Sequence, residues 1–192
     1  MDVTFFFDPA CPWTWRTSRW LETVARERGL SVEWRAFSLT ILNGGETPPE
    51  FAEAMAASGR ALRLVEALRA EGRHSDVGRF YAELGTRTHD AGNPPSDKLV
   101  AAAVEAAGLE SAAPALDDER WDEQVRESHA TAYASAGPDI GSPVLTVPGV
   151  DRGLHGPIIT EVPGTDDALT IWDSLLPLLR LDAFHEIKRG RR

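Results

Sequence analysis

The order in which strand-like and helix-like segments follow one another is the feature that most constrains the fold of this 192-residue chain. Residues 3–7 are a β-branched and aromatic run, long enough for one buried strand. Residues 12–28 fit a helix, with Pro12 in its first turn and Gly29 as its stop. Residues 31–38 alternate as a second strand does. The opening is therefore β-α-β, which predicts two parallel strands joined by a right-handed crossover.

The middle of the chain changes character, because about 90 residues after the second strand are rich in Ala, Leu, Arg and Glu and carry helical periodicity. Ser96 follows a pair of prolines and is expected to cap one of these helices. Strand character returns at residues 143–147, a turn leads to a short partner strand at 153–156, and residues 165–181 form a last amphipathic helix. The helices expected in the middle block cover residues 50–72, with a break or kink near Gly59, and residues 76–90, 96–107 and 117–135.

A β-α-β unit, a helical block and a β-β-α unit in this order are the plan of an α/β protein with a thioredoxin fold and an inserted all-helical domain. We expect residues 1–45 and 138–192 to form the thioredoxin-like domain and residues 46–137 to form the helical insertion domain. In that topology the first strand ends beside the loop that precedes the third strand. Cys11 and the Ser142–Pro143 pair are therefore expected to face each other.

Cys11 is the only cysteine in the sequence, and it lies where the first strand gives way to the first helix. A thiol at a helix N-terminus is close to the positive end of the helix dipole and to unpaired N–H groups, which lower its pKa. We therefore expect Cys11 to be a thiolate nucleophile. The alternative is a cysteine that packs as a small buried hydrophobic side chain.

Charge and composition restrict the partners. The formal net charge is −10, from 20 basic and 30 acidic residues, which argues against nucleic acid and anionic membranes. One cysteine allows no internal disulfide, and the sequence shows no secretory leader and no membrane-length apolar stretch, so we expect a cytoplasmic protein. The histidines and the cysteine lack metal-ligand spacing, and no phosphate-binding glycine loop is present. We therefore expect no metal and no bound cofactor.

Several stretches match the pattern of one protein family. They are residues 7–13, 17–20 and 38–43, His89 with Gly92 and Asn93, and more weakly Ser128 with His129 and Gly156 with Pro157. With these stretches the chain resembles the DsbA-like branch of the thioredoxin superfamily, and most closely its actinobacterial mycothiol-dependent nitroreductase group. That group typically carries Cys-Pro-Trp-Cys, whereas the last position here is Thr14. The family's resolving thiol is absent, so its dithiol cycle does not carry over.

The resemblance implies an oxidoreductase in which Cys11 forms a mixed disulfide with a small thiol cosubstrate, mycothiol or a similar compound. Without a second cysteine, only an outside thiol can release that mixed disulfide, so the cycle would be monothiol. The Thr14 hydroxyl could donate a hydrogen bond to the sulfur. Pro143 occupies the position of the superfamily's cis-proline, which implies that the Ser142 backbone pairs with an extended substrate. The alternative is a trans proline that begins an edge strand.

Further residues are candidates for substrate contact. Trp13 could stack on an aromatic substrate or simply pack in the core. His89 and Asn93 could line a cleft opposite Cys11, with His89 as a proton donor or polar contact, or they could serve only the local end of a helix. Asn43 could contact substrate or have an ordinary loop role. The six candidates are Pro12, Trp13, Asn43, His89, Asn93 and Ser142.

Taken together, these features favour an enzyme that acts on small electrophilic or aromatic compounds, nitro compounds among them, with the help of a small thiol. A close variant is a thiol transferase or isomerase, because kappa-class glutathione transferases and hydroxychromene carboxylate isomerases resemble the same plan with a serine at the position of Cys11. A third alternative is a redox-silent protein that holds a small aromatic ligand or a partner protein. The sequence leaves open whether the chain forms a homodimer.

Overall fold

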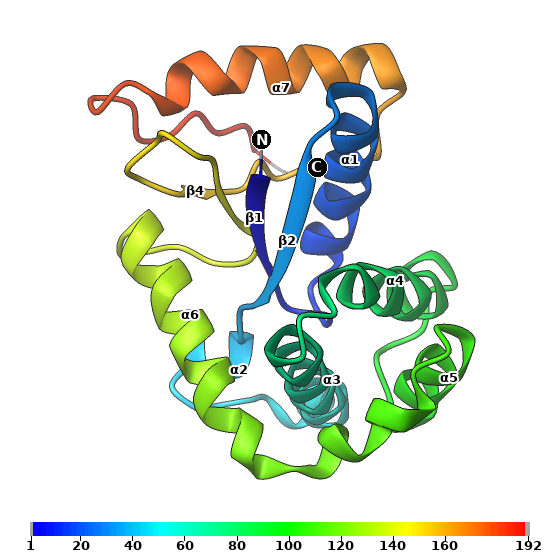
Figure 1. Cartoon of the computed structure of the whole chain (residues 1–192). Helices are drawn as coiled ribbons and strands as arrows, with labels where there is room; N and C mark the ends of the chain where they lie inside the picture. Colours follow the sequence, from blue (N-terminus) through cyan, green and yellow to red (C-terminus); the bar gives the residue numbers. More distant parts are fainter. Residues whose placement is uncertain (1, 191–192) are drawn as a thin grey trace.

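The computed structural model describes residues 2–190 and is built on a four-stranded sheet with strand order β2-β1-β3-β4 (Figure 1). Strand β1 (Asp2–Phe7) pairs in parallel with β2 (Ser31–Ala36). On its other side β1 pairs antiparallel with β3 (Val144–Thr146), which pairs antiparallel with β4 (Leu154–His155). The predicted parallel opening and the predicted late hairpin are both confirmed.

Helix α1 (Pro12–Arg28) and helix α6 (Asp122–Ala136) lie on opposite sides of the sheet (Figure 1). The alternation of side chains along β1 explains this arrangement, because successive residues of a strand point to opposite faces. Phe5 and Phe7 are buried in the cluster that contains the apolar side of α1. Phe6 is buried with Ala132 of α6. An unbroken run of three phenylalanines can therefore be buried on both faces of one strand.

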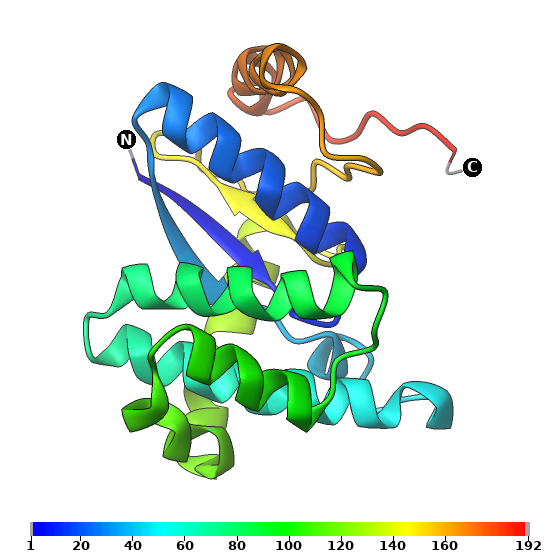
Figure 2. The same ribbon diagram turned by 90° about the vertical axis from the view of Figure 1, so that its right-hand side faces the viewer.

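The last helix, α7 (Thr165–Leu179), packs on α1 (Figure 2). The Trp20 indole donates a hydrogen bond of 3.0 Å from Nε1 to the carbonyl oxygen of Ala168. The ring centroids of Trp20 and Trp172 are 6.1 Å apart. Helix α1 ends at Gly29 with φ 62°, a left-handed conformation that glycine adopts at little cost. The predicted bounds of α1 are confirmed.

Between β2 and β3 the chain is helical, and the structure corrects several predicted bounds there. Gly59 does not break α3, because one glycine lowers helix stability by only about 1 kcal/mol and its neighbours are good helix formers. Ser96 occupies the N-cap position of α5, yet its side chain makes no capping hydrogen bond. The predicted helix 117–135 is α6 preceded by tighter turns. The elements are α2 (Leu39–Leu42), η1 (Pro49–Phe51), α3 (Ala52–Ala70), α4 (His74–Gly85), η2 (Thr86–Asp90), α5 (Asp97–Ala106), η3 (Glu110–Asp117) and η4 (Glu119–Trp121).

One continuous buried cluster joins the helical block to the sheet and α1. Phe7 of β1 stacks on Tyr81 of α4 with ring centroids 4.0 Å apart, and Trp15 of α1 meets Tyr81 edge-on at 5.5 Å. The division into residues 1–45 with 138–192 and residues 46–137 stays a prediction. Within residues 2–190, no helix is long and apolar enough to cross a membrane.

Gly85 of α4 lies directly against the Trp15 ring of α1. A Cβ atom at this position would lie 2.1 Å from Cε3 of Trp15, which is a severe overlap. Gly59 of α3, by contrast, has no atom within 4 Å of the equivalent position. The two glycines therefore form a matched pair of helical positions: Gly85 has no room for a methyl group, and Gly59 has room for one.

We predict that Gly85→Ala lowers the free energy of unfolding by about 1–3 kcal/mol, because the added methyl group overpacks the contact with Trp15. Gly59→Ala is expected to leave stability unchanged or raise it by about 0.5–1 kcal/mol, through helix propensity alone. Urea denaturation followed by tryptophan fluorescence measures both. Equal stabilities of the two variants would contradict the packing derived for Gly85.

Candidate active site

Cys11 lies at the N-cap of α1 with 7% of its surface exposed. Its backbone N–H donates to the Asp8 carbonyl oxygen at 3.1 Å, and its own carbonyl oxygen accepts from the Trp15 N–H at 3.1 Å. Its thiol donates to the Ser142 carbonyl oxygen at an Sγ···O distance of 3.7 Å. The peptide bond between Ser142 and Pro143 is cis. The two segments that the topology predicted to face each other are therefore in contact.

A short series of hydroxyl groups runs from the end of β1 to the sulfur. The Asp8 N–H donates to Ser142 Oγ at 3.2 Å, and Ser142 Oγ lies 2.7 Å from Thr14 Oγ1. The Thr14 hydroxyl is also one of the groups that favour the thiolate form of Cys11. These contacts are all satisfied if Ser142 donates to Thr14 and Thr14 donates to the sulfur. A hydrogen bond from Thr14 to the sulfur stays a prediction.

Burial raises the pKa of the Cys11 thiol. The Thr14 hydroxyl and the backbone N–H groups of Thr14 and Trp13 act in the opposite direction, and the nearby charge of Asp8 adds to the rise. The expectation of a lowered thiol pKa is therefore wrong for this structure. The helix N-terminus is present as predicted, but the depth at which the sulfur is buried outweighs it.

Asp8, which the sequence analysis did not single out, is the most connected side chain of the site. It is 1% exposed. Its Oδ1 accepts from the Ala10 N–H at 2.8 Å and from the Ser58 hydroxyl at 2.5 Å, and its Oδ2 accepts from the Leu39 N–H at 2.7 Å. Burial raises the pKa of this carboxyl group, and the three hydrogen bonds oppose the rise. An acidic residue directly after a buried strand and three residues before Cys11 was the signal that could have found it.

His89 does not offer a free proton to a substrate. Its Nε2–H donates to the Pro9 carbonyl oxygen at 2.8 Å, because a carbonyl can only accept. Its ring stacks on Trp15 with centroids 6.1 Å apart, and the Trp15 indole donates to Asp90 Oδ1 at 2.7 Å. Burial lowers the pKa of His89 and favours the neutral ring. The residue therefore fastens η2 to the loop of residues 8–11, which we call the Cys11 loop.

The remaining candidates divide into two groups. Pro12 is exposed at the first position of α1, and Trp13 beside it is half-buried. The guanidinium carbon of Arg16, a residue that sequence analysis missed, lies 5.2 Å from the centre of the Trp13 ring. This group forms the rim next to the sulfur.

Asn43 and Asn93 are both exposed and lie outside this rim. Asn43 is the C-cap of α2. Asn93 uses its side-chain amide to donate to the Arg87 carbonyl oxygen at 3.1 Å. In the described part of the chain, neither side chain hydrogen-bonds the Cys11 loop. Residues 2–190 also contain no group of three or more His, Cys, Asp or Glu side chains that could hold a metal ion.

The four-stranded sheet, the helical insertion between β2 and β3 and a cysteine at the start of α1 are features of the class of DsbA-like thioredoxin-fold proteins. Solved structures agree: 2-hydroxychromene-2-carboxylate isomerase is 17% identical with a TM-score of 0.63 over 94% of this chain and 97% of its own. The cytosolic disulfide reductase DsbM from Pseudomonas aeruginosa is 16% identical with a TM-score of 0.55 over 93% and 100%. The probable DsbA oxidoreductase SCO1869 from Streptomyces coelicolor is 18% identical with a TM-score of 0.56 over 92% and 90%. At these identities the likeness concerns the fold.

The sequence comparisons identify a specific family within this fold class. Residues 10–189 match the Rv2466c-like family model, described as mycothiol-dependent nitroreductase Rv2466c. The uncharacterized protein Rv2286c of Mycobacterium tuberculosis is 32% identical over 197 residues, which cover 98% of this chain and 82% of the relative. The chain belongs to the Rv2466c-like family, so the resemblance found in the sequence is confirmed. Family and fold together point to a thiol oxidoreductase in general terms.

We predict that Asp8→Asn and Thr14→Val move the pKa of Cys11 in opposite directions. Removing the Asp8 charge lowers it, because that charge disfavours the thiolate, whereas removing the Thr14 hydroxyl raises it. Iodoacetamide reacts with the thiolate, so the pH of half-maximal alkylation falls in Asp8→Asn and rises in Thr14→Val.

Asp90→Asn is the control, because Asp90 binds Trp15 and is not among the groups that shift the pKa of Cys11. Its alkylation profile should match that of the unmodified protein. A shift of the same sign in Asp8→Asn and Thr14→Val would contradict the electrostatic account of the site.

Proposed function

We propose that this protein is a thiol-dependent oxidoreductase in which Cys11 works without a second protein thiol. The observation that carries the proposal is the contact between Cys11 Sγ and the Ser142 carbonyl oxygen, at 3.7 Å, with Thr14 where a dithiol enzyme would carry its second cysteine. Membership in a family described as mycothiol-dependent supports mycothiol, or a closely similar small thiol, as the cosubstrate. We propose the reducing cytoplasm as its location, where a lone thiol persists.

The proposed cycle begins when the Cys11 thiol loses its proton. The hydrogen bonds from the Thr14 hydroxyl and the N–H groups of Thr14 and Trp13 then stabilise the thiolate. At the same time the Ser142 carbonyl oxygen loses the S–H group that it accepts in the resting protein. It becomes free to accept an amide N–H from an extended thiol cosubstrate, and this pairing holds the cosubstrate sulfur next to Cys11.

The electron balance closes with two molecules of the small thiol, RSH. For a nitro compound, one Cys11 thiol and one RSH supply two electrons and two protons: the nitro group becomes a nitroso group, water leaves, and Cys11 carries a mixed disulfide with R. A second RSH then attacks that mixed disulfide, which releases RSSR and restores the Cys11 thiol. No residue of the chain other than Cys11 changes its oxidation state in this cycle.

The rim next to the sulfur is the proposed contact for the substrate. Trp13 presents a half-buried aromatic ring, and Arg16 places a positive charge over it. Such a pair favours a flat, electron-poor compound that carries partial negative charge on oxygen atoms. His89 acts here as a positioning residue, because its hydrogen bond to the Pro9 carbonyl oxygen fixes the Cys11 loop.

We predict that incubation with the symmetrical disulfide of mycothiol adds one mycothiol unit to the protein, located at Cys11. Intact-mass spectrometry followed by peptide mapping measures the adduct, and 1,4-dithiothreitol should remove it. Cys11→Ser should show no adduct and no thiol-linked reduction of a nitroaromatic substrate. An unmodified mass after prolonged incubation at alkaline pH would rule out the mixed disulfide and favour a redox-silent protein or a transferase.

We predict that Thr14→Cys restores a dithiol cycle. The Thr14 side chain already lies close to the Cys11 sulfur, so a thiol at this position can attack the mixed disulfide. The adduct should then be transient, and the final product should carry an internal disulfide with a mass about 2 Da below that of the dithiol form. Thr14→Ser, which keeps the hydroxyl, should retain the stable adduct. A lasting adduct in Thr14→Cys would contradict the geometry assigned to residue 14.

A further inference from the structure

A cavity of about 360 Å³ opens between α2 and α6, and no residue of the Trp13 rim lines it. Its lining is mainly apolar, and two alanines of α6, Ala130 and Ala134, are among the lining residues. Ile41 and Tyr133 are unusually exposed for large side chains, at 36% and 37%, and both belong to the cavity wall. The lining residues are Ile41, Leu42, His129, Ala130, Tyr133 and Ala134.

His129 supplies the polar group that such a cavity needs for selectivity. The side chain is 7% exposed, and its Nδ1 lies 3.3 Å from the backbone nitrogen of Ser38, whose N–H donates to it. Because Nδ1 is the acceptor, the proton of the neutral ring is on Nε2. Burial lowers the pKa of His129, which keeps the ring neutral at neutral pH. Among residues 2–190, the Nε2–H group has no hydrogen-bond acceptor.

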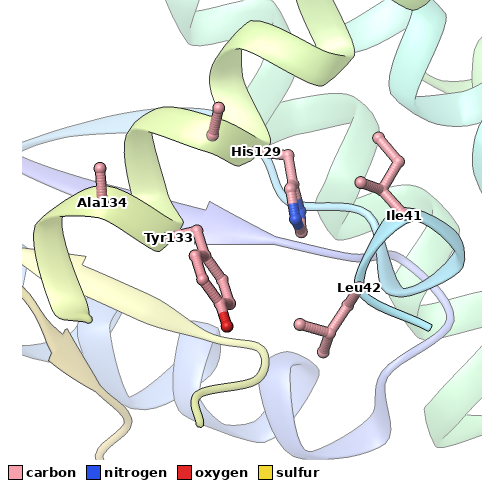
Figure 3. Close-up of a pocket in the computed structure, with 6 residues that line it drawn as sticks. Ile41, Leu42, His129, Tyr133 and Ala134 are labelled. Atoms are coloured by element: carbon pink, nitrogen blue, oxygen red, sulfur yellow. The ribbon is translucent and has the colours of Figure 1, made fainter. Parts of the chain in front are cut away.

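The position of the ring is fixed by aromatic neighbours. Phe37 holds one side with ring centroids 4.5 Å apart, and Tyr133 lies nearly parallel to the imidazole at 6.2 Å. In Figure 3, His129 extends from α6 into the space between Tyr133 and Ile41. An oriented ring N–H donor therefore stands in a mainly apolar, partly aromatic cavity, whose other polar side-chain group is the Tyr133 hydroxyl.

We propose that this cavity binds a small neutral aromatic compound that carries a hydrogen-bond acceptor oxygen, with that oxygen on His129 Nε2–H and the ring between α2 and α6. A neutral ligand fits because no Lys or Arg side chain lines the cavity and the imidazole is itself uncharged. An aromatic ligand fits because Tyr133 and the aliphatic wall offer flat contact. The proposal does not depend on the redox cycle of Cys11.

The cavity is distinct from the Cys11 site but shares one structural turn with it. The Ser38 N–H donates to His129, and the next backbone N–H, that of Leu39, donates to Asp8. Two successive backbone amides thus bind the polar groups of the two sites. A ligand on His129 would lie on one side of this turn, with the Cys11 loop on the other.

Acetophenone and α-methylstyrene are the probes that test the proposal, because the two molecules have the same shape and only acetophenone has an acceptor oxygen. Titration of the ¹⁵N-labelled full chain, followed by NMR, should show acetophenone perturbing the amides of Leu42, Ala130 and Ala134. Acetophenone should bind about 2- to 12-fold more tightly than α-methylstyrene, the range that one hydrogen bond supplies. Equal affinities, or no binding of acetophenone up to its solubility limit, would overturn the proposal.

Substitutions in α6 test whether the probe binds in the cavity or elsewhere on the surface. Ala130→Leu fills the cavity from an exposed position of α6 and should weaken acetophenone binding at least tenfold. Thr131→Leu is the matched control, because residue 131 is exposed on the same helix and does not line the cavity, and it should change nothing. His129→Phe keeps an aromatic ring at this position, removes the Nε2–H donor, and should make the two probes bind equally. Unchanged binding in Ala130→Leu, or perturbations centred on Trp13 and Arg16, would refute the site.

Discussion

The buried carboxylate of Asp8 is the interaction on which the rest of the structure depends. A carboxylate with 1% exposure is stable only if its oxygens are satisfied by donors, and here the donors come from three different segments. Ala10 belongs to the Cys11 loop, Leu39 begins α2, and Ser58 lies in α3. None of these segments can move without leaving a carboxyl oxygen unpaired inside the protein. The position of Cys11 follows from this restraint.

The helical insertion is attached through the site itself. Ser58 of α3 is one point of attachment, through its hydrogen bond to Asp8. In addition, Gly85 of α4 packs against Trp15, and His89 of η2 donates a hydrogen bond to the carbonyl oxygen of Pro9 in the Cys11 loop. Some of the contacts that join the helical block to the rest of the chain are therefore made by residues close to the sulfur.

Local patterns predicted much of the fold. The bounds of α1, the parallel pair of β1 with β2, the late hairpin and α7 follow from periodicity, turn residues and caps, and the contact of Cys11 with Ser142 follows from topology. What the sequence did not reveal depends on partners far along the chain. Burial and tertiary contacts set three features that no short stretch of sequence contains. These are the continuity of α3 through Gly59, the role of Asp8 and the direction in which the pKa of Cys11 shifts.

Thr14 has a consequence at the level of cellular chemistry. In a dithiol protein, the oxidised fraction at equilibrium depends on the square of the small-thiol concentration divided by the concentration of the small disulfide. Dilution of both small molecules at a constant ratio therefore changes the oxidised fraction. In the cycle proposed for Cys11, one thiol is released for each one captured, and the modified fraction depends only on the ratio of disulfide to thiol. In that proposed cycle, one hydroxyl in place of one sulfur would make the protein responsive to the redox balance of the pool and indifferent to its size.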